Sequence, residues 1–237
     1  MKINNAIVLL FTLLLMSFIT KAQTTKNFSK MSGYTAIPDI NFEKALVDRG
    51  YDSHIDGQVL TARIIGIRDL DISFRKISNL TGIQDFLALT SLKCLYNKLT
   101  NLDLSKNTAL AYLDCSNNNL SALDLTQNQA LAKLICFNNQ LEVLRVDTNL
   151  GLTELNCSGN QLLSLDVNKN AALFHLDCSK NRLSALEVSK NKALSYLRCS
   201  QNKLTVLDVS QNIQLTYFYY RYNLLIHNEC KPKSQFN

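Results

Sequence analysis

Apolar residues recur along most of this chain with a period of 21 residues. One unit has the pattern L-x-C-x-x-N-x-L followed by L-x-L-x-x-N-x-x-L, as between Leu113 and Leu131. Because side chains two positions apart in a strand point to the same side, Leu113 and Cys115 predict a short strand with one buried face. Each unit then turns once and lays its strand beside the previous one, so that equivalent side chains stack into ladders.

The units predict a single elongated solenoid over residues 70–225. Seven 21-residue units run from Leu92 to about Leu225, and a looser 22-residue unit begins at Leu70, with Arg75 in its asparagine position. A unit of this size cannot bury its apolar face alone, so we expect one continuous core that forms by stacking and needs a cap at its end.

Three further series of residues, one of cysteines and two of asparagines, recur every 21 residues in step with the leucines. We expect the first asparagine of each unit to bond the backbone groups of the turn after the strand, because an amide offers both donors and an acceptor; a ligand-binding row is the alternative. The second asparagine is expected to serve the turns on the opposite side of the coil. The cysteines are Cys94, Cys115, Cys136, Cys157, Cys178 and Cys199, and the asparagines are Asn97, Asn118, Asn139, Asn160, Asn181, Asn202 and Asn223, then Asn107, Asn128, Asn149, Asn170, Asn191 and Asn212.

The cysteine ladder is open to three interpretations. Zinc would need ligands that converge on one tetrahedral point, which a row along a solenoid does not supply. Disulfides between neighbouring units would need side chains that point towards each other, whereas these run parallel. We therefore favour small buried hydrophobic side chains, although exported proteins usually oxidise their thiols. Cys230 lies outside the ladder and has no evident partner.

The ends of the chain differ from the repeats. Residues 1–22 carry an early Lys2, an apolar stretch and a small-residue site at Ala22, as in a cleaved signal peptide, with an uncleaved anchor as the alternative. Residues 23–33 read as a flexible leader, residues 34–69 as a helical cap with one helix over 38–50, and residues 226–237 as a tail. Asp52 and Asp56 only faintly resemble a calcium loop, and we predict no metal site, no cofactor and no membrane span in the mature chain.

Residues on the exposed side of the strands are the candidate ligand contacts. They alternate with the buried leucines, so the scaffold does not dictate their type. Tyrosine and arginine are common in binding hot spots, and the apolar residues Ile135 and Phe137 suggest a contact patch. One alternative is a solvated face that binds nothing. At the tyrosine-rich end, the other alternative is a cap over the last coil. The residues are Tyr112, Lys133, Glu154, His175, Tyr196, Tyr217, Asp114, Ile135, Asp177, Arg198 and Phe137.

Charge and composition exclude other classes of protein. The formal net charge of +6 comes from scattered lysines and arginines, without the basic run that nucleic-acid binding requires. The three histidines share no motif, and no catalytic signature or phosphate-binding glycine loop is present. We predict neither an enzyme nor a nucleic-acid-binding protein.

The unit resembles the leucine-rich repeat, and the 21-residue period with cysteine in place of a leucine resembles the internalin family. The segment from Pro38 to Leu46 is similar to the cap of many secreted bacterial repeat proteins. The resemblance implies an α/β repeat fold: a leucine-rich-repeat solenoid with a parallel β-sheet on its concave face, an irregular convex side and a helical N-terminal cap.

The same resemblance implies an exported receptor or adhesin that binds a protein or glycan ligand, such as a mucin, on the concave face. Secretion or the cell surface is the expected location, with the periplasm as an alternative. Two other functions stay open: a structural module of the envelope or matrix that self-associates through its edges, and a secreted effector or inhibitor of a host protein. Internalins of this kind carry a wall-anchoring motif and further C-terminal domains, whereas this sequence extends only to Asn237. We therefore expect a fragment, a free secreted protein or one held at the surface by a partner.

Overall fold

The computed structural model describes residues 33–225 and the short strand at 230–231. The predicted signal peptide, nearly all of the leader and most of the C-terminal tail, including His227, lie outside the described residues. Among the described residues, no helix has the length and hydropathy that crossing a bilayer would require.

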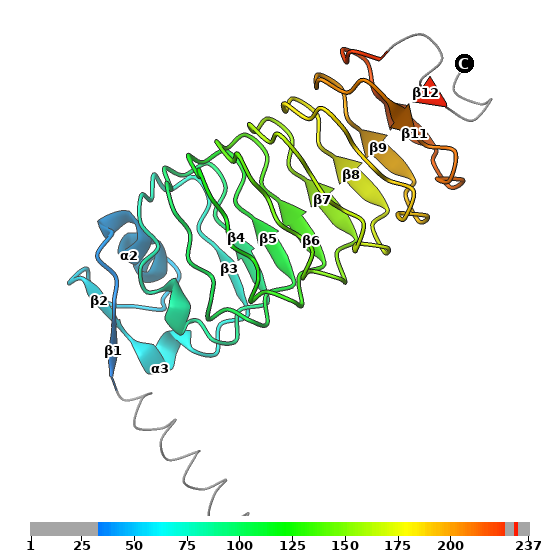
Figure 1. The fold of residues 1–237 in the computed structure, drawn as a ribbon. Helices are drawn as coiled ribbons and strands as arrows, with labels where there is room; N and C mark the ends of the chain where they lie inside the picture. Colours follow the sequence, from blue (N-terminus) through cyan, green and yellow to red (C-terminus); the bar gives the residue numbers. More distant parts are fainter. Residues whose placement is uncertain (1–32, 226–229, 232–237) are drawn as a thin grey trace, which may run out of the picture.

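The described chain is a parallel β-solenoid, as the repeats predict. Three-residue strands, each from one coil, stand side by side along its length in the order β11-β9-β8-β7-β6-β5-β4-β3 (Figure 1). Each strand leucine pairs in register with the leucine of the next coil, for example Leu134 with Leu155. The strands are β3 (Asp69–Asp71), β4 (Ser91–Lys93), β5 (Tyr112–Asp114), β6 (Lys133–Ile135), β7 (Glu154–Asn156), β8 (His175–Asp177), β9 (Tyr196–Arg198) and β11 (Tyr217–Tyr219).

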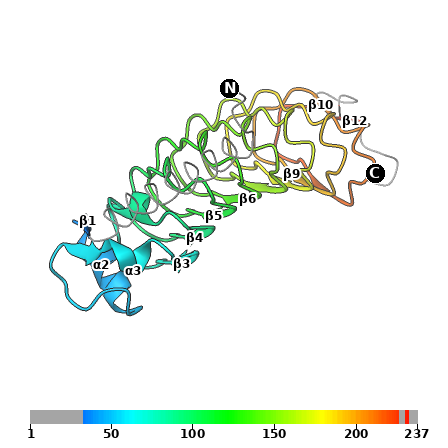
Figure 2. The same ribbon diagram turned by 90° about the horizontal axis from the view of Figure 1, so that it is seen from below.

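The sheet occupies one side of the solenoid, and irregular loops form the other (Figure 2). A two-residue strand, β10 (Leu207–Asp208), pairs in parallel with β12 (Cys230–Lys231) in a separate sheet. Outside the cap, the described residues contain one further helical element, the 3-10 turn η1 (Ile83–Asp85). Helices are therefore few, in keeping with the predicted fold.

The core is built from the ladders. The strand leucines from Leu92 to Leu197 and the six ladder cysteines from Cys94 to Cys199 have no exposed surface. No disulfide bond joins these six cysteines to one another. The interpretation of the cysteines as small buried hydrophobic residues is confirmed.

The first asparagine ladder joins each coil to the one before it. Asn160 Nδ2 donates to the carbonyl oxygens of Cys136 and Cys157, both at 3.0 Å, and its Oδ1 accepts from the amide of Leu141 at 3.0 Å. One side chain thus bonds three buried backbone groups, and each of the two carbonyls also accepts from the asparagine of a neighbouring coil. The same pattern recurs from Asn118 to Asn223.

The second ladder bonds differently. Asn149 Nδ2 donates to the carbonyl oxygens of Leu125 at 3.2 Å and Asn128 at 2.8 Å. Its Oδ1 is buried and has no hydrogen-bond partner among the described residues. This ladder therefore stabilises the turns through its donors alone.

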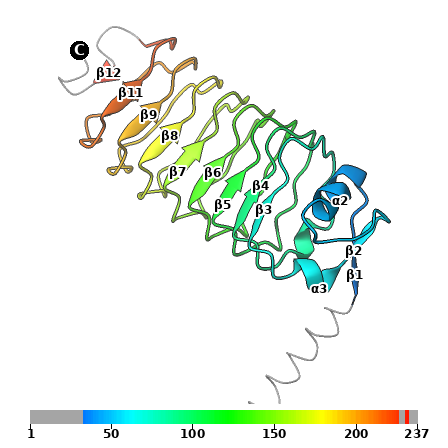
Figure 3. The ribbon, with the colours of Figure 1, turned by 180° about the vertical axis from the view of Figure 1, so that it is seen from behind.

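The N-terminal cap mixes helix and strand. It contains β1 (Tyr34–Ala36), α2 (Ile40–Val47), β2 (Gln58–Leu60) and α3 (Thr61–Ile64), and it covers the end of the solenoid beside β3 (Figure 3). Phe42, Ala45 and Leu46 of α2 are completely buried, and the Phe42 ring lies 6.1 Å from that of Phe86.

Two details of the cap differ from the sequence expectation. Helix α2 is shorter than the expected 38–50, because Asp39 is its N-cap and accepts the amides of Asn41 and Phe42. Strands β1 and β2, on either side of α2 in the sequence, pair in a two-stranded antiparallel sheet that the sequence did not indicate. Each has only three residues, too few for an alternating pattern to stand out.

Candidate binding surface on the sheet face

The sheet face is the surface formed by the outward side chains of β3 to β9 and β11. Each three-residue strand has an inward residue in the middle, a buried leucine in β3 to β9 and the half-buried Phe218 in β11, so the residues on both sides of it point outward. The parallel register aligns them in two columns along the solenoid. The first column is Tyr112, Lys133, Glu154, His175, Tyr196 and Tyr217, and the second is Lys93, Asp114, Ile135, Asn156, Asp177, Arg198 and Tyr219.

The N-terminal half of the sheet face consists of charges that compensate one another. The ammonium groups of Lys93 and Lys133 lie 5.8 and 5.6 Å from the centre of the Tyr112 ring. Lys133 Nζ also lies 2.8 Å from Glu154 Oε2. Burial, and then the nearby Asp114, raise the pKa of Tyr112. The ring is held between two cations, and it keeps its hydroxyl proton.

The C-terminal half of the sheet face carries a stack of three rings. The centres of His175 and Tyr196 are 4.0 Å apart at an interplanar angle of 7°, and those of Tyr196 and Tyr217 are 4.2 Å apart at 2°. Burial and the neighbouring Tyr217 raise the pKa of Tyr196. Because the ring faces cover each other, the stack presents mainly its edges and hydroxyl groups to a ligand.

The two aspartates of the second column are less available than the sequence suggested. Asp114 and Asp177 are only 8% and 6% exposed. Each accepts a 2.6 Å hydrogen bond from the serine hydroxyl two residues later, Ser116 or Ser179, and also that residue's amide. These carboxylates stabilise the ends of their strands.

The remaining predicted contacts are accessible in part. Ile135 and Phe137 are half-buried and lie on and just after β6. Arg198 lies 3.8 Å from Asp177 Oδ2, and its guanidinium is 5.7 Å from the centre of the Tyr219 ring. The structure therefore brings the predicted residues onto one face, but it divides them between a charged half and an aromatic half.

A hollow beside the cap was not predicted from the sequence. It has a volume of about 450 Å³, and its lining includes Arg49 from the cap, Asp71 and Tyr112 from the sheet, and Phe74. The Phe74 ring stacks on Tyr96, with centres 4.7 Å apart. Arg49 follows the cap helix and lies far from the strands in the sequence, so no local signal could have placed it here.

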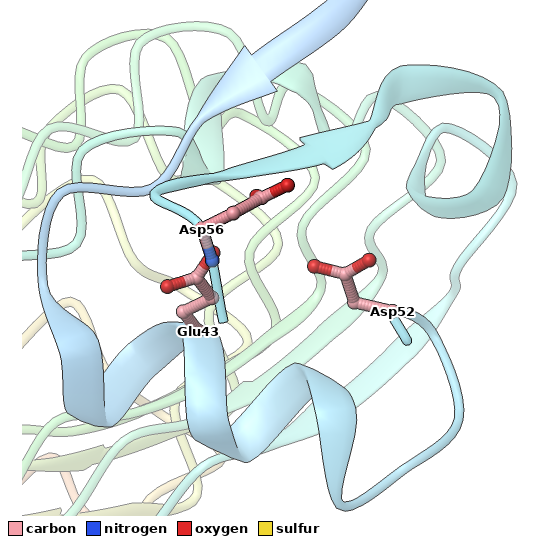
Figure 4. A group of neighbouring side chains, drawn as sticks. All are labelled: Glu43, Asp52 and Asp56. Carbon is pink, nitrogen blue, oxygen red and sulfur yellow. The ribbon is translucent and has the colours of Figure 1, made fainter. Parts of the chain in front are cut away.

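Three carboxylates of the cap lie close together (Figure 4). Oxygen atoms of Glu43, Asp52 and Asp56 all lie within 4.8 Å of one another. The sequence drew attention to Asp52 and Asp56 but not to Glu43, which comes from α2. Glu43 is only 2% exposed, and its Oε1 accepts the amides at positions 56, 57 and 58. Its evident role is to close the loop between α2 and β2.

The repeats are similar to those of bacterial internalins. Internalin J of Listeria monocytogenes serotype 4b (strain F2365) is 35% identical over 88 residues, which are 37% of this chain and only 9% of internalin J. The solved functional domain of InlJ from Listeria monocytogenes, described as including a cysteine ladder, has a TM-score of 0.67 and 34% identity, covering 82% of this chain and 49% of that domain.

A second solved structure shows the likeness of the fold. Internalin C2 from Listeria monocytogenes has a TM-score of 0.72 at 21% identity, covering 84% of this chain and 88% of its own. No family model matches the chain. The repeats, the buried cysteine ladder and these similarities identify the chain as a leucine-rich-repeat protein of the internalin type.

Proposed function

We propose that this chain is an exported leucine-rich-repeat binding protein, similar to an adhesin or receptor, that engages a protein or glycan ligand on its sheet face. The observation that carries the proposal is the ring stack of His175, Tyr196 and Tyr217. Tyr217 is 45% exposed at the end of that stack. Accessible aromatic residues held rigidly in a row can supply contact area with little loss of side-chain entropy.

Export is part of the same proposal. Residues 1–22 have the composition of a signal peptide, and we propose that the mature chain begins at Gln23 and acts outside the cytoplasm. Complete burial of the six ladder thiols supports this, because it would protect them from oxidation in that location.

The proposal is tested by measuring binding of the mature chain to an array of mucins, other glycans and extracellular-matrix proteins. A variant with Tyr112, Tyr196 and Tyr217 all changed to Ala is measured beside it. We expect saturable binding by the parent chain and at least a tenfold weaker affinity in the variant, since loss of a hot-spot residue commonly costs about 2 kcal/mol.

The matched control changes Val143, Leu163 and Val206 to Ala. These residues are 62%, 63% and 52% exposed and lie away from the sheet face. Their loss should leave binding unchanged. If both variants bind as the parent does, the sheet face is not the ligand site.

A further inference from the structure

The charges of this protein are unevenly distributed along the solenoid. Residues 169–225 contain eight lysines and arginines against three aspartates and glutamates. Residues 33–168 contain eleven against fifteen. The C-terminal coils are therefore basic, whereas the cap and the N-terminal coils are mildly acidic. A net charge that changes sign along one molecule directs a charged partner to one end of it.

Four of these cations gather at one edge of the sheet. Lys180 and Arg182 follow strand β8, Lys203 follows β9, and Arg221 follows β11. All four are exposed, and none forms an ion pair with a described carboxylate. We call these four residues the basic rim.

The acidic residues of the same coils do not neutralise the basic rim. Asp177 is buried, its Oδ1 accepts the amide and hydroxyl of Ser179, and its Oδ2 lies 3.8 Å from Arg198. Glu187 and Asp208 belong to the segment of the coil that contains β10, which is outside the main sheet. The rim thus keeps its positive charge.

The basic rim is a local feature and not a property of every coil. In the three coils before it, the residues at the positions of Lys180 and Arg182 are uncharged. They are Asn117 and Asn119, Asn138 and Gln140, and Gly159 and Gln161. The scaffold therefore tolerates neutral side chains here, and the cations are not needed to build the turn.

The basic rim borders the aromatic half of the sheet face. Along β8 and β9, the stacked rings of His175 and Tyr196 stand at the first strand position. Arg198 follows at the third position, and the cations lie just beyond the strand ends. A partner that covers the ring stack would therefore meet positive charge along one side.

We propose that the ligand is a protein that lays an acidic segment containing aromatic or aliphatic residues across the ring stack and the basic rim. This inference rests on the proposed function and specifies the chemistry of the partner. The rim extends over only three neighbouring coils, roughly 10 to 15 Å at about 4.8 Å per strand. That track is short for a sulfated glycan held by charge alone, and tyrosine with arginine is the composition of protein-binding hot spots.

The test uses short synthetic peptides and the mature chain. One peptide has three repeats of Asp-Tyr-Glu-Leu, a second has Asn-Tyr-Gln-Leu, and a third has Lys-Tyr-Lys-Leu. Fluorescence anisotropy should show tightest binding of the acidic peptide, with affinity that falls as salt rises from about 50 to about 200 mM, because exposed charges are screened. Heparin is the sulfated-glycan probe.

The rim is tested with a variant that carries Lys180→Gln, Arg182→Gln and Lys203→Gln. Since each exposed charge contributes modestly, we expect about a tenfold loss of affinity for the acidic peptide. The matched control carries Lys169→Gln, Lys190→Gln and Lys192→Gln. These lysines are also exposed and lie in the turns that surround the second asparagine ladder. The control changes the net charge equally and should bind within about twofold of the parent.

Several results would overturn the inference. Equal losses in both triple variants would mean that only net charge matters. Equal affinity for the amide peptide would remove the role of acidic residues. Binding of heparin without binding of the acidic peptide would favour a glycan, and concentration-dependent dimerisation abolished by the rim variant would favour a second copy of this chain.

Failure of the inference can be separated from failure of the proposed function. If the Tyr112, Tyr196 and Tyr217 variant loses an array ligand but the rim variant retains it, the sheet face binds and the acidic partner is wrong. If the rim variant loses the acidic peptide but the tyrosine variant retains it, the rim is a binding site and the sheet-face function is wrong.

Discussion

At the scale of single residues, the ladder thiols have a property that follows from their burial. Burial raises the pKa of Cys94, Cys136 and Cys178 well above the usual value, with neighbouring cysteines as a further cause. Burial also raises the pKa of Cys115 and Cys157, with Asp114 and Asp177 as further causes. All five therefore remain protonated at a pH where the thiols of an unfolded chain have ionised.

We predict that alkaline pH destabilises the fold through these cysteines. The contribution of these thiols to the unfolding free energy is fully present below their pKa in the unfolded chain, about 8.5. It is lost as the pH rises towards their higher pKa in the folded protein. Raising the pH from 8 to 9.5 should therefore lower the unfolding free energy by about 1.2 kcal/mol for each thiol, or about 6 kcal/mol for all five. Urea unfolding in reducing buffer at both pH values measures this. Cys157→Ala should reduce the difference by about 1 kcal/mol; an unchanged difference would contradict the prediction.

The first asparagine ladder gives a second residue-scale prediction. Asn160→Ala would remove the partner of the buried Leu141 amide and one of the two asparagine donors to each carbonyl of Cys136 and Cys157. The unsatisfied amide costs about 1 to 3 kcal/mol and each lost bond to a carbonyl about 0.5 to 1.5 kcal/mol, so we expect the unfolding free energy to fall by about 3 kcal/mol. Denaturant titration measures the change.

The control is Asn168→Ala, because Asn168 is exposed and belongs to neither ladder. Its effect should stay within about 0.5 kcal/mol. Similar losses in the two variants would mean that the ladder bonds add nothing beyond an ordinary surface asparagine.

At the scale of elements, Asp39 joins the cap to the first coil. Its Oδ1 accepts the amides of Asn41 and Phe42, at 2.9 and 3.1 Å. Its Oδ2 accepts the amide and hydroxyl of Ser78, both at 2.8 Å, and the amide of Asn79 at 3.0 Å. Burial alone would raise the pKa of Asp39, but these hydrogen bonds together hold it below the ordinary 3.8. The charged form therefore stabilises the docked helix.

We predict that the cap loosens in acid. A depressed pKa contributes stability above the unfolded value near 3.8, and that contribution is lost as the pH falls through the lower folded value. Hydrogen exchange of α2, followed by mass spectrometry from pH 5 down to pH 2.5 and divided by the intrinsic rate at each pH, should show lower protection at the acidic end than at pH 5. In Asp39→Asn, which keeps an acceptor but not the charge, the protection of α2 should be low already at pH 5 and change little on acidification.

The elements also show which parts of the structure could be predicted from the sequence. The strands from β4 to β11 were predictable because Leu113 and Cys115 and their equivalents repeat at a fixed interval. The β1–β2 pair was not, because three residues with one buried side chain, Val59 in β2, give no readable period. The rows of the sheet face followed from the register, but the hollow beside Arg49 did not, because Arg49 lies outside the repeats. The neighbourhood of Lys180, Arg182 and Lys203 also follows from the 21-residue period, since Arg182 and Lys203 are equivalent positions; that these cations form no ion pair with a described carboxylate was visible only in the structure.

At the scale of the whole molecule, stability should depend on contacts between neighbouring coils. Strand β7 pairs only with β6 and β8, and Leu155 in its centre is completely buried. The asparagine ladder likewise connects each coil to the coil before it. A solenoid of this kind behaves as a row of units with nearest-neighbour coupling.

We therefore predict that a defect in the central coil splits the unfolding of the molecule. Leu155→Asp places a carboxylate in the apolar core and weakens both interfaces of β7, at a cost above about 4 kcal/mol. The block from β3 to β6 keeps its cap, which buries Phe42 against Phe86, whereas the block from β8 to β11 loses the coil on which it stacks. In low urea, hydrogen exchange should become fast in residues 175–225 while residues 40–135 stay protected, and Leu155→Met should leave a single transition. Loss of protection at the same urea concentration throughout would show that the coils unfold as one cooperative unit despite their local contacts.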